Sequence, residues 1–189
     1  TGCSSIWGGT AAVSPYTVNK ASGHGPAWNN SLFEDNAEHG FGLYLGQKTI
    51  RENTLKLVAE MAANEKATAE FKAAYEEFMK TKDNTMANIE PAKALIAEIE
   101  KAAAAGCPIA PEVLANKQYL AKKSCWIFGG DGWAYDIGYG GVDHVLASGE
   151  DVNIMVFDTE MYSNTGGQAS KASNIGEVCQ FAAAGKEIK

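Results

Sequence analysis

The chain has 189 residues and a formal net charge of -7 at pH 7. That length can bury one core of ordinary size, so it predicts a single domain or a domain with an appendage. The acidic excess, without any cluster of basic residues, argues against nucleic-acid binding, and no apolar run approaches the roughly 20 residues that a membrane-spanning helix requires.

Both ends of the sequence suggest a fragment or a processed piece. The chain begins at Thr1 with neither a methionine nor a basic, apolar leader, so no targeting signal is expected. It stops within a run from Val178 to Lys189 that has the character of a helix. Residues 1–30 are rich in Gly, Ser, Asn and aromatic residues with little periodicity, which predicts loops of the kind that often carry function.

The cysteines indicate a reduced setting. Cys3, Cys107, Cys125 and Cys179 form no CxxC pair, so neither a zinc site nor a redox dithiol is expected within the chain. Four thiols of this kind fit an intracellular protein better than a disulfide framework. Cys125 lies in a strand-like run, which predicts a buried thiol.

Residues 31–123 are predicted to be mostly helical, because apolar residues recur there at helical spacing. The stripes comprise Ile50, Leu57, Val58 and Met61, then Phe71, Ala74, Tyr75 and Phe78, then Leu95, Ile96 and Ile99. The stretch from Asn64 to Ala105 is rich in Ala, Glu and Lys, which predicts a solvated helical hairpin packed by one face. Basic and acidic residues balance from Arg51 to Lys123, so the acidic excess lies in the remaining residues.

Residues 124–189 predict a βαβ unit and hence an α/β fold class. SCWIFGG is a short apolar run ending in glycines, as in a strand. A helix is predicted from Ile137 to Ser148, with Gly149 as its stop. VNIMVFD is a second strand-like run without alternation, as expected of a strand buried on both faces of a parallel sheet. The polar loop SNTGGQASKASN follows, and then a final helix from about Ile175.

Polar residues follow both predicted strands, where open parallel sheets bind their ligands. The first strand runs into Gly129-Gly130-Asp131-Gly132-Trp133, whose glycines permit close approach of a phosphate to a helix N-terminus. A carboxylate there would repel a phosphate unless a cation lay between them, so Asp131 is interpreted as a magnesium ligand. After Asp158, the segment from Thr159 to Gly167 offers hydroxyl, amide and backbone oxygens.

Each of these features also has a structural interpretation. GDG is a common turn, Asp131 could cap the helix that follows it, and SNTGG could be an ordinary polar loop. The pairing of two such loops, each after a buried strand, favours a phosphate or cofactor site, but spacing alone leaves both interpretations open.

The motif strings resemble a known family. GDG followed by an Asn-containing segment resembles the thiamine diphosphate motif. The longer string GDGWAYDIGYGGVDHVLASGEDVNIMVFDTEMYSNTGGQASKAS is similar to the pyruvate:ferredoxin (flavodoxin) oxidoreductase family throughout, as are TGCSSIWGG and GPAWNNSLFEDNAEHGFG. The resemblance covers about 1–50 and 120–180, and it implies the parallel sheet of the thiamine diphosphate-binding fold, with a helical insertion at about 51–120.

The resemblance also implies roles for individual residues. Mg²⁺ would be bound by Asp131, Thr159 and the backbone carbonyl of Met161. Asn164 would reach the carbons of pyruvate as a catalytic residue, and Ser163-Asn164 stands where the general thiamine motif has paired asparagines. The full set implied to bind cofactors is Cys3, Gly130, Asp131, Gly132, Trp133, Thr159, Glu160, Met161, Tyr162, Ser163 and Asn164.

Cys3 resembles a cysteine that ligates the family's 4Fe–4S cluster nearest the thiamine. Such a cluster normally requires four thiolates. Cys107, Cys125 and Cys179 do not match the family's other ligands, so the remaining ligands would lie outside these residues.

The implied reaction is the oxidative decarboxylation of pyruvate to acetyl-CoA and CO₂, with coenzyme A as acceptor and electrons passing through iron–sulfur clusters to ferredoxin or flavodoxin in anaerobic metabolism. Residues 1–189 would form one thiamine diphosphate- and magnesium-binding domain, incomplete at both ends and inactive alone. The implied partners are the enzyme's remaining domains and further copies in a homo-oligomer. The implied location is the cytoplasm, or an anaerobic organelle in a eukaryote.

Two alternatives remain at this point. One is another thiamine-dependent 2-oxoacid oxidoreductase or decarboxylase. The other is a non-catalytic phosphate-binding or interface module.

Overall fold

A computed structural model describes residues 18, 20, 23, 25–31 and 34–188. These residues divide into two compact units. One comprises the described residues of Thr1–Tyr44 together with Cys125–Lys189, and the other comprises Leu45–Ser124. Cys3 lies outside the described residues, so the expectation attached to it concerns a part of the chain that the structure does not cover.

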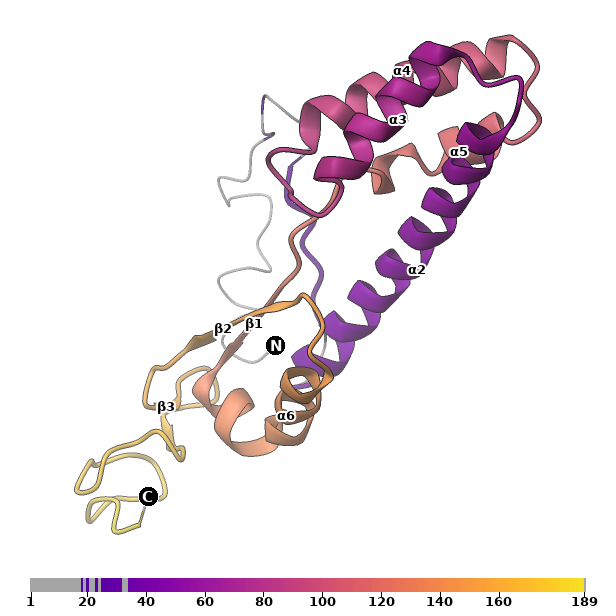
Figure 1. The fold of residues 1–189 in the computed structure, drawn as a ribbon. Helices are drawn as coiled ribbons and strands as arrows, with labels where there is room; N and C mark the ends of the chain where they lie inside the picture. Colours follow the sequence, from indigo (N-terminus) through magenta and orange to yellow (C-terminus); the bar gives the residue numbers. More distant parts are fainter. Residues whose placement is uncertain (1–17, 19, 21–22, 24, 32–33, 189) are drawn as a thin grey trace. The chain divides into compact units, whose positions relative to one another are not determined.

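The unit Leu45–Ser124 is helical (Figure 1). It contains the greater part of α2 (Asn36–Ala63), then α3 (Ala69–Thr81), α4 (Ile89–Ala104), α5 (Ala110–Ala115) and the short 3₁₀ turn η1 (Lys117–Tyr119). Thr68 caps α3, because its side-chain oxygen accepts a hydrogen bond from the backbone N–H of Phe71 at 3.1 Å.

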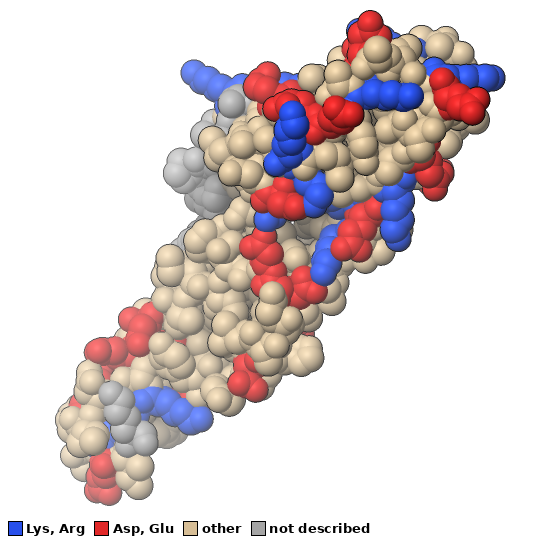
Figure 2. Space-filling model, in the orientation of Figure 1, with Lys and Arg blue, Asp and Glu red and all other residues tan. Residues whose placement is uncertain are grey.

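The predicted apolar stripes form the core of this unit. Its buried residues are Val58, Met61, Phe71, Phe78, Ala92, Leu95, Ile99, Ala110, Val113 and Leu120. Ile50 departs from its predicted stripe, because it is 36% exposed. Figure 2 shows blue and red side chains interspersed over the helices, and three Lys–Glu pairs are spaced i,i+3 along α3 and α4. Ion pairs on the solvent-exposed surface contribute little to stability, so the apolar core is the main source of this unit's stability.

The second unit contains the predicted βαβ arrangement. Strand β1 (Trp126–Gly130) is followed by a π-helical turn η2 (Gly132–Ile137), helix α6 (Tyr139–Ser148) and strand β2 (Asn153–Phe157). The strands are parallel and in step from Trp126↔Asn153 to Gly130↔Phe157. Helix α6 ends as predicted at Gly149, which has a left-handed φ of 64°. Because the strands are in step, the loops after Gly130 and Phe157 begin side by side.

The sheet differs from the expectation in its exposure. Strand β2 is not buried on both faces, since Met155 is 43% exposed, and Trp126 of β1 is 53% exposed. Ile127 and Trp133 belong to the cluster of buried side chains that forms the core of this unit. Within the described residues the parallel sheet has only two strands, which leaves the other side chains partly open to solvent. Cys125 directly precedes β1 and is partly exposed rather than buried.

The prediction of a final helix from Ile175 is wrong. Residues 175–188 contain turns and bridges instead, including hydrogen bonds from Gly176 N to Lys186 O at 2.7 Å and from Lys186 N to Glu177 O at 2.9 Å. The large apolar residues of this run are exposed, namely Ile175, Val178, Phe181 at 92% and Ile188, whereas Cys179 is buried. An amphipathic helix owes most of its stability to burial of its apolar face, and this run lacks that burial in the described structure.

One short strand directly precedes the predicted polar loop and a second lies within it. Strand β3 (Met161–Tyr162) pairs antiparallel with β4 (Gln168–Ala169). None of the helices in the described part of the chain combines the length and apolar character needed to cross a membrane.

The helical core yields a stability prediction. Leu95→Ala removes a side chain that is fully buried in the unit's core, so it should lower the free energy of unfolding by about 2–5 kcal/mol. Met86→Ala alters a residue that is 70% exposed and should change that free energy by less than about 0.5 kcal/mol. Urea denaturation followed by circular dichroism measures both, and equal effects of the two substitutions would contradict the assigned core.

Candidate functional site

The carboxylate of Asp131 joins the loops that follow the two parallel strands. Asp131 is 1% exposed. Its Oδ1 accepts hydrogen bonds from the backbone N–H of Thr159 at 3.1 Å and from Thr159 Oγ1 at 2.9 Å. Its Oδ2 accepts a hydrogen bond from Ser170 Oγ at 2.5 Å. Both oxygens therefore have partners in a segment that is distant in the sequence.

The alternative interpretation of Asp131 as a helix cap is wrong. Asp131 does occupy the position before η2, but its side chain makes no capping hydrogen bond to that turn. A capping residue must direct its side-chain oxygen at the first N–H groups of its own helix. The carboxylate points instead to Thr159 and Ser170, because those residues supply the donors that a buried carboxylate needs.

Thr159 lies at the centre of a second set of oxygen contacts. Its Oγ1 is 3.0 Å from the backbone oxygen of Met161 and 2.7 Å from Ser163 Oγ. The intervening residue, Glu160, has a φ of 63°, in the left-handed region that non-glycine residues rarely adopt. Its backbone oxygen accepts a hydrogen bond from Ser173 Oγ, and its N–H donates to Asp158 Oδ1 at 3.2 Å. These bonds hold the turn in which the oxygens of Thr159 and Met161 approach one another.

Two oxygen–oxygen distances at Thr159 match those between adjacent ligands of a small octahedral cation. Mg²⁺ binds oxygen ligands at 2.0–2.1 Å in an octahedron, so adjacent ligands lie about 2.9 Å apart. Thr159 Oγ1 is 2.9 Å from Asp131 Oδ1 and 3.0 Å from Met161 O. Carboxylate, hydroxyl and carbonyl oxygens are also ligand types that such a cation accepts. Among the described residues no group of three or more His, Cys, Asp or Glu side chains could hold a metal, so this arrangement rests on one carboxylate.

Three glycines near Asp131 are required by packing against aromatic rings. A Cβ on Gly129 would lie 2.0 Å from Cε3 of Trp133, and one on Gly138 would lie 2.3 Å from Cδ1 of the same ring. A Cβ on Gly132 would lie 2.3 Å from Cε1 of Tyr162. Tyr162 comes from the second loop and its hydroxyl donates to Gly132 O at 3.4 Å. The GDG sequence therefore allows the two loops to meet at van der Waals distance.

Acidic side chains surround the aromatic hydroxyls of the site. The pKa of Tyr162 is raised above its ordinary value, mainly by burial and then by the negative charges of Asp136, Glu34 and Asp131. The pKa of Tyr135 is also raised, again mainly by burial and then by Asp158 and Asp131. A negative potential of this kind favours a bound cation, and it would oppose a diphosphate that arrived without one.

Most of the residues predicted from the sequence come together in this region. Asp131, Gly132, Thr159, Met161, Tyr162 and Ser163 are connected by the contacts above. Gly130 ends β1, and Asn164 lies exposed directly after Ser163. Trp133 is 1% exposed, so its ring packs within the unit, and Glu160 contributes its backbone turn.

Three residues outside the predicted set also take part. Ser170, Ser173 and Lys186 bind one another or the loop backbone. The sequence predicts the polar loop, but its composition does not distinguish Ser170 from the other serines. Only the approach of the loop to Asp131 does so.

Comparison with known proteins connects this region to pyruvate oxidoreductases. No model of a known protein family matches the chain. The chain is 53% identical over its whole length to the pyruvate:ferredoxin oxidoreductase of Moorella thermoacetica, and 50% identical to the pyruvate-flavodoxin oxidoreductase of Klebsiella pneumoniae. Over 98% of its length it is 47% identical to a protein of Euglena gracilis named as a mitochondrial pyruvate dehydrogenase (NADP(+)).

The chain is thus the counterpart of one segment of pyruvate oxidoreductases. The proteins that it matches at about half identity are named pyruvate:ferredoxin or pyruvate-flavodoxin oxidoreductase, which confirms the resemblance predicted from the sequence. It spans 16% of the length of the Moorella and Klebsiella proteins and 10% of the Euglena protein.

The glycine contacts yield a matched pair of substitutions. Gly129→Ala forces a methyl group into the Trp133 ring and should lower the free energy of unfolding by about 1–3 kcal/mol. Gly140→Ala places a methyl group in α6, where nothing lies within 4 Å, and should be neutral or stabilising by up to about 1 kcal/mol. Thermal denaturation compares the two variants. A Gly129→Ala variant as stable as Gly140→Ala would contradict the described packing.

Proposed function

We propose that the chain belongs to the pyruvate:ferredoxin (flavodoxin) oxidoreductase family and forms its thiamine diphosphate- and magnesium-binding region. The observation that carries this proposal is the position of Thr159 Oγ1, 2.9 Å from Asp131 Oδ1 and 3.0 Å from Met161 O, which are the distances between adjacent magnesium ligands. The names of the relatives support the same assignment. The parallel strand pair, with both loops at its carboxyl end, supports a sheet of the thiamine diphosphate-binding fold.

Each loop has its own part in the proposed site. Asp131, Thr159 and the carbonyl of Met161 hold Mg²⁺, which neutralises the negative charge of the cofactor's diphosphate. The turn at Gly130 and Gly132 lets the backbone come close to the diphosphate, while Trp133 supports that turn from within the unit.

The second loop completes the proposed surroundings of the cofactor. Glu160, Tyr162 and Ser163 line the diphosphate side, and Asn164, which is exposed, extends toward the substrate carbons. Thiamine diphosphate, when bound, supplies the electron sink for decarboxylation, while the chain's residues anchor and orient it.

The complete protein would oxidise pyruvate to acetyl-CoA and CO₂ with coenzyme A as acceptor. Its electrons would pass through a 4Fe–4S cluster, for which Cys3 is one ligand, to ferredoxin or flavodoxin. Residues 1–189 would be one incomplete domain, with a helical insertion at about 51–120, in a homo-oligomeric cytoplasmic enzyme or its organellar equivalent. The other cluster ligands and the acid that activates the cofactor would lie in the remaining domains.

A second candidate concerns the electron acceptor. The Euglena relative is named as an NADP(+) pyruvate dehydrogenase. A thiamine-dependent pyruvate oxidoreductase that passes electrons to a nicotinamide would use the same magnesium ligands. Assay of the full-length protein with ferredoxin, flavodoxin and NADP⁺ in turn distinguishes these acceptors.

The metal ligand set is tested by Asp131→Asn. This substitution preserves the size of the side chain but removes its negative charge, so magnesium-dependent binding of thiamine diphosphate to the full-length protein should weaken by about 100-fold or more. Isothermal titration calorimetry in the presence and absence of Mg²⁺ measures the change.

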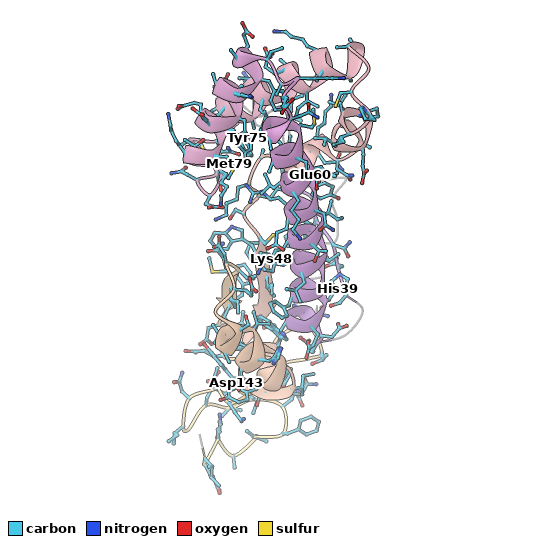
Figure 3. All side chains as sticks on the ribbon, turned by 45° about the vertical axis from the view of Figure 1, so that its right-hand side comes forward. His39, Lys48, Glu60, Tyr75, Met79 and Asp143 are labelled. Atoms are coloured by element: carbon cyan, nitrogen blue, oxygen red, sulfur yellow. The ribbon has the colours of Figure 1, made fainter. Side chains whose placement is uncertain are left out.

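The matched control is Asp143→Asn on α6, an exposed carboxylate labelled in Figure 3. It removes one negative charge from the same unit and should leave binding within about twofold, because surface charges act weakly over distance in salt. Unchanged binding in Asp131→Asn, or equal losses in both variants, would refute the assigned ligand.

A second test asks whether residues 1–189 are active without the rest of the proposed enzyme. Purified residues 1–189 should bind thiamine diphosphate weakly and form no acetyl-CoA from pyruvate, because the cluster and the activating acid are proposed to lie elsewhere. A coupled assay for acetyl-CoA measures this. Turnover by residues 1–189 alone would show that the site is complete within them.

A further inference from the structure

Ser170 holds one oxygen of the Asp131 carboxylate. Ser170 is 4% exposed, and its Oγ donates a hydrogen bond to Asp131 Oδ2 at 2.5 Å. The other oxygen, Oδ1, is the one that lies 2.9 Å from Thr159 Oγ1. The two oxygens of this carboxylate therefore have different surroundings: Oδ1 faces the proposed cation ligands and Oδ2 faces a buried hydroxyl.

The position of Ser170 is itself determined by two further residues. The backbone N–H of Ser170 donates to Ser173 Oγ at 2.9 Å, and Ser173, which is fully buried, donates from that hydroxyl to Glu160 O. Ser173 thereby connects the Ser170 segment to the turn that carries the Met161 carbonyl. The hydroxyl of Ser170 and the proposed ligand oxygens of Thr159 and Met161 therefore belong to one hydrogen-bond network.

Lys186 also binds the backbone of the Ser170 segment. Its ammonium group donates to the backbone oxygens of Ser170, Lys171 and Ser173, the last two at 3.1 and 2.8 Å. A lysine ammonium has three N–H donors, so these three carbonyls account for all of them. Hydrogen bonds that involve a charged group are stronger than neutral ones. The Ser170 segment is therefore fixed against the carboxylate rather than free to withdraw from it.

The Ser170 hydroxyl is a competitor for a cation at Oδ2. A cation that bound both oxygens would compete with the Ser170 hydroxyl, whose hydrogen bond to Oδ2 is 2.5 Å long, for the electron density of Oδ2. Mg²⁺ accepts single carboxylate oxygens in a strict octahedron, whereas Ca²⁺ takes six to eight oxygens at 2.3–2.6 Å and often binds a carboxylate through both. A fixed hydroxyl on Oδ2 therefore disfavours Ca²⁺ more than Mg²⁺.

We propose that Ser170 is a metal-specificity residue, which keeps Asp131 monodentate and so makes the site prefer Mg²⁺ to Ca²⁺. This inference rests on the proposed function, because it concerns the same cation. Ser170 acts through Asp131 and does not itself bind the metal. Lys186 acts indirectly, because its ammonium group binds the backbone oxygen of Ser170.

The test is the preference between two cations. Binding of thiamine diphosphate to the full-length protein is titrated by calorimetry with Mg²⁺ alone and with Ca²⁺ alone, and the ratio of the two dissociation constants is compared between variants. Ser170→Ala should shift this ratio toward Ca²⁺ by about tenfold, the size expected for loss of a hydrogen bond to a charged acceptor. Lys186→Met should shift the ratio in the same direction by a smaller factor.

Two controls separate specificity from a general loss of structure. Ser170→Thr keeps the hydroxyl and should retain the original ratio. Ser148→Ala removes a hydroxyl that bonds to the backbone of Val145 at the end of α6, and it should leave both dissociation constants unchanged. Melting temperatures of all variants show whether each one is folded.

The outcomes distinguish the inference from the proposed function. If the unaltered protein binds the cofactor with Mg²⁺ and Ser170→Ala weakens binding equally with both cations, Ser170 is structural and the specificity role is overturned while the proposed function stands. If the unaltered protein binds thiamine diphosphate with neither cation, both proposals fail.

Discussion

The candidate site depends on hydrogen bonds to one buried carboxylate, that of Asp131. Asp131 has almost no contact with solvent, and a buried charge is costly unless hydrogen-bond donors or a cation replace its water. Its donors come from Thr159 and Ser170, which lie 28 and 39 residues further along the chain. The second loop must therefore turn back toward the first. The left-handed backbone of Glu160 and the close approach of Tyr162 to Gly132 are the local consequences of that requirement.

The parallel strand pair makes this convergence possible. Gly130 and Phe157 are partners in the register, so both loops leave the sheet at the same edge. Parallel strands need a crossover connection, and η2 with α6 supplies it directly after the carboxylate. Gly129 and Gly138 have no Cβ to clash with the Trp133 ring, so the start of the crossover can pack closely against that ring. Regular backbone pairing thus brings together side chains that the sequence separates.

A site with one carboxylate suits a cation that arrives with an anionic cofactor. In the proposed site, three protein oxygens would leave room in an octahedral shell for phosphate oxygens, and the negative charges of the surrounding acidic residues would favour the cation. The chain is the counterpart of a minor part of its relatives' length, and the proposed function assigns the redox clusters and the activating acid to the remainder.

Local patterns in the sequence were sufficient to predict the helices of residues 31–123, both parallel strands, and the stop at Gly149, because periodicity and the left-handed glycine depend on nearby residues. The convergence of the GDG and Thr159 loops was predictable for a similar reason, since parallel strands end at one edge. The missing final helix and the roles of Ser170 and Lys186 were decided by tertiary structure. An apolar stripe forms a stable helix only where a partner covers it, and a serine becomes a carboxylate's donor only where the fold brings the two together.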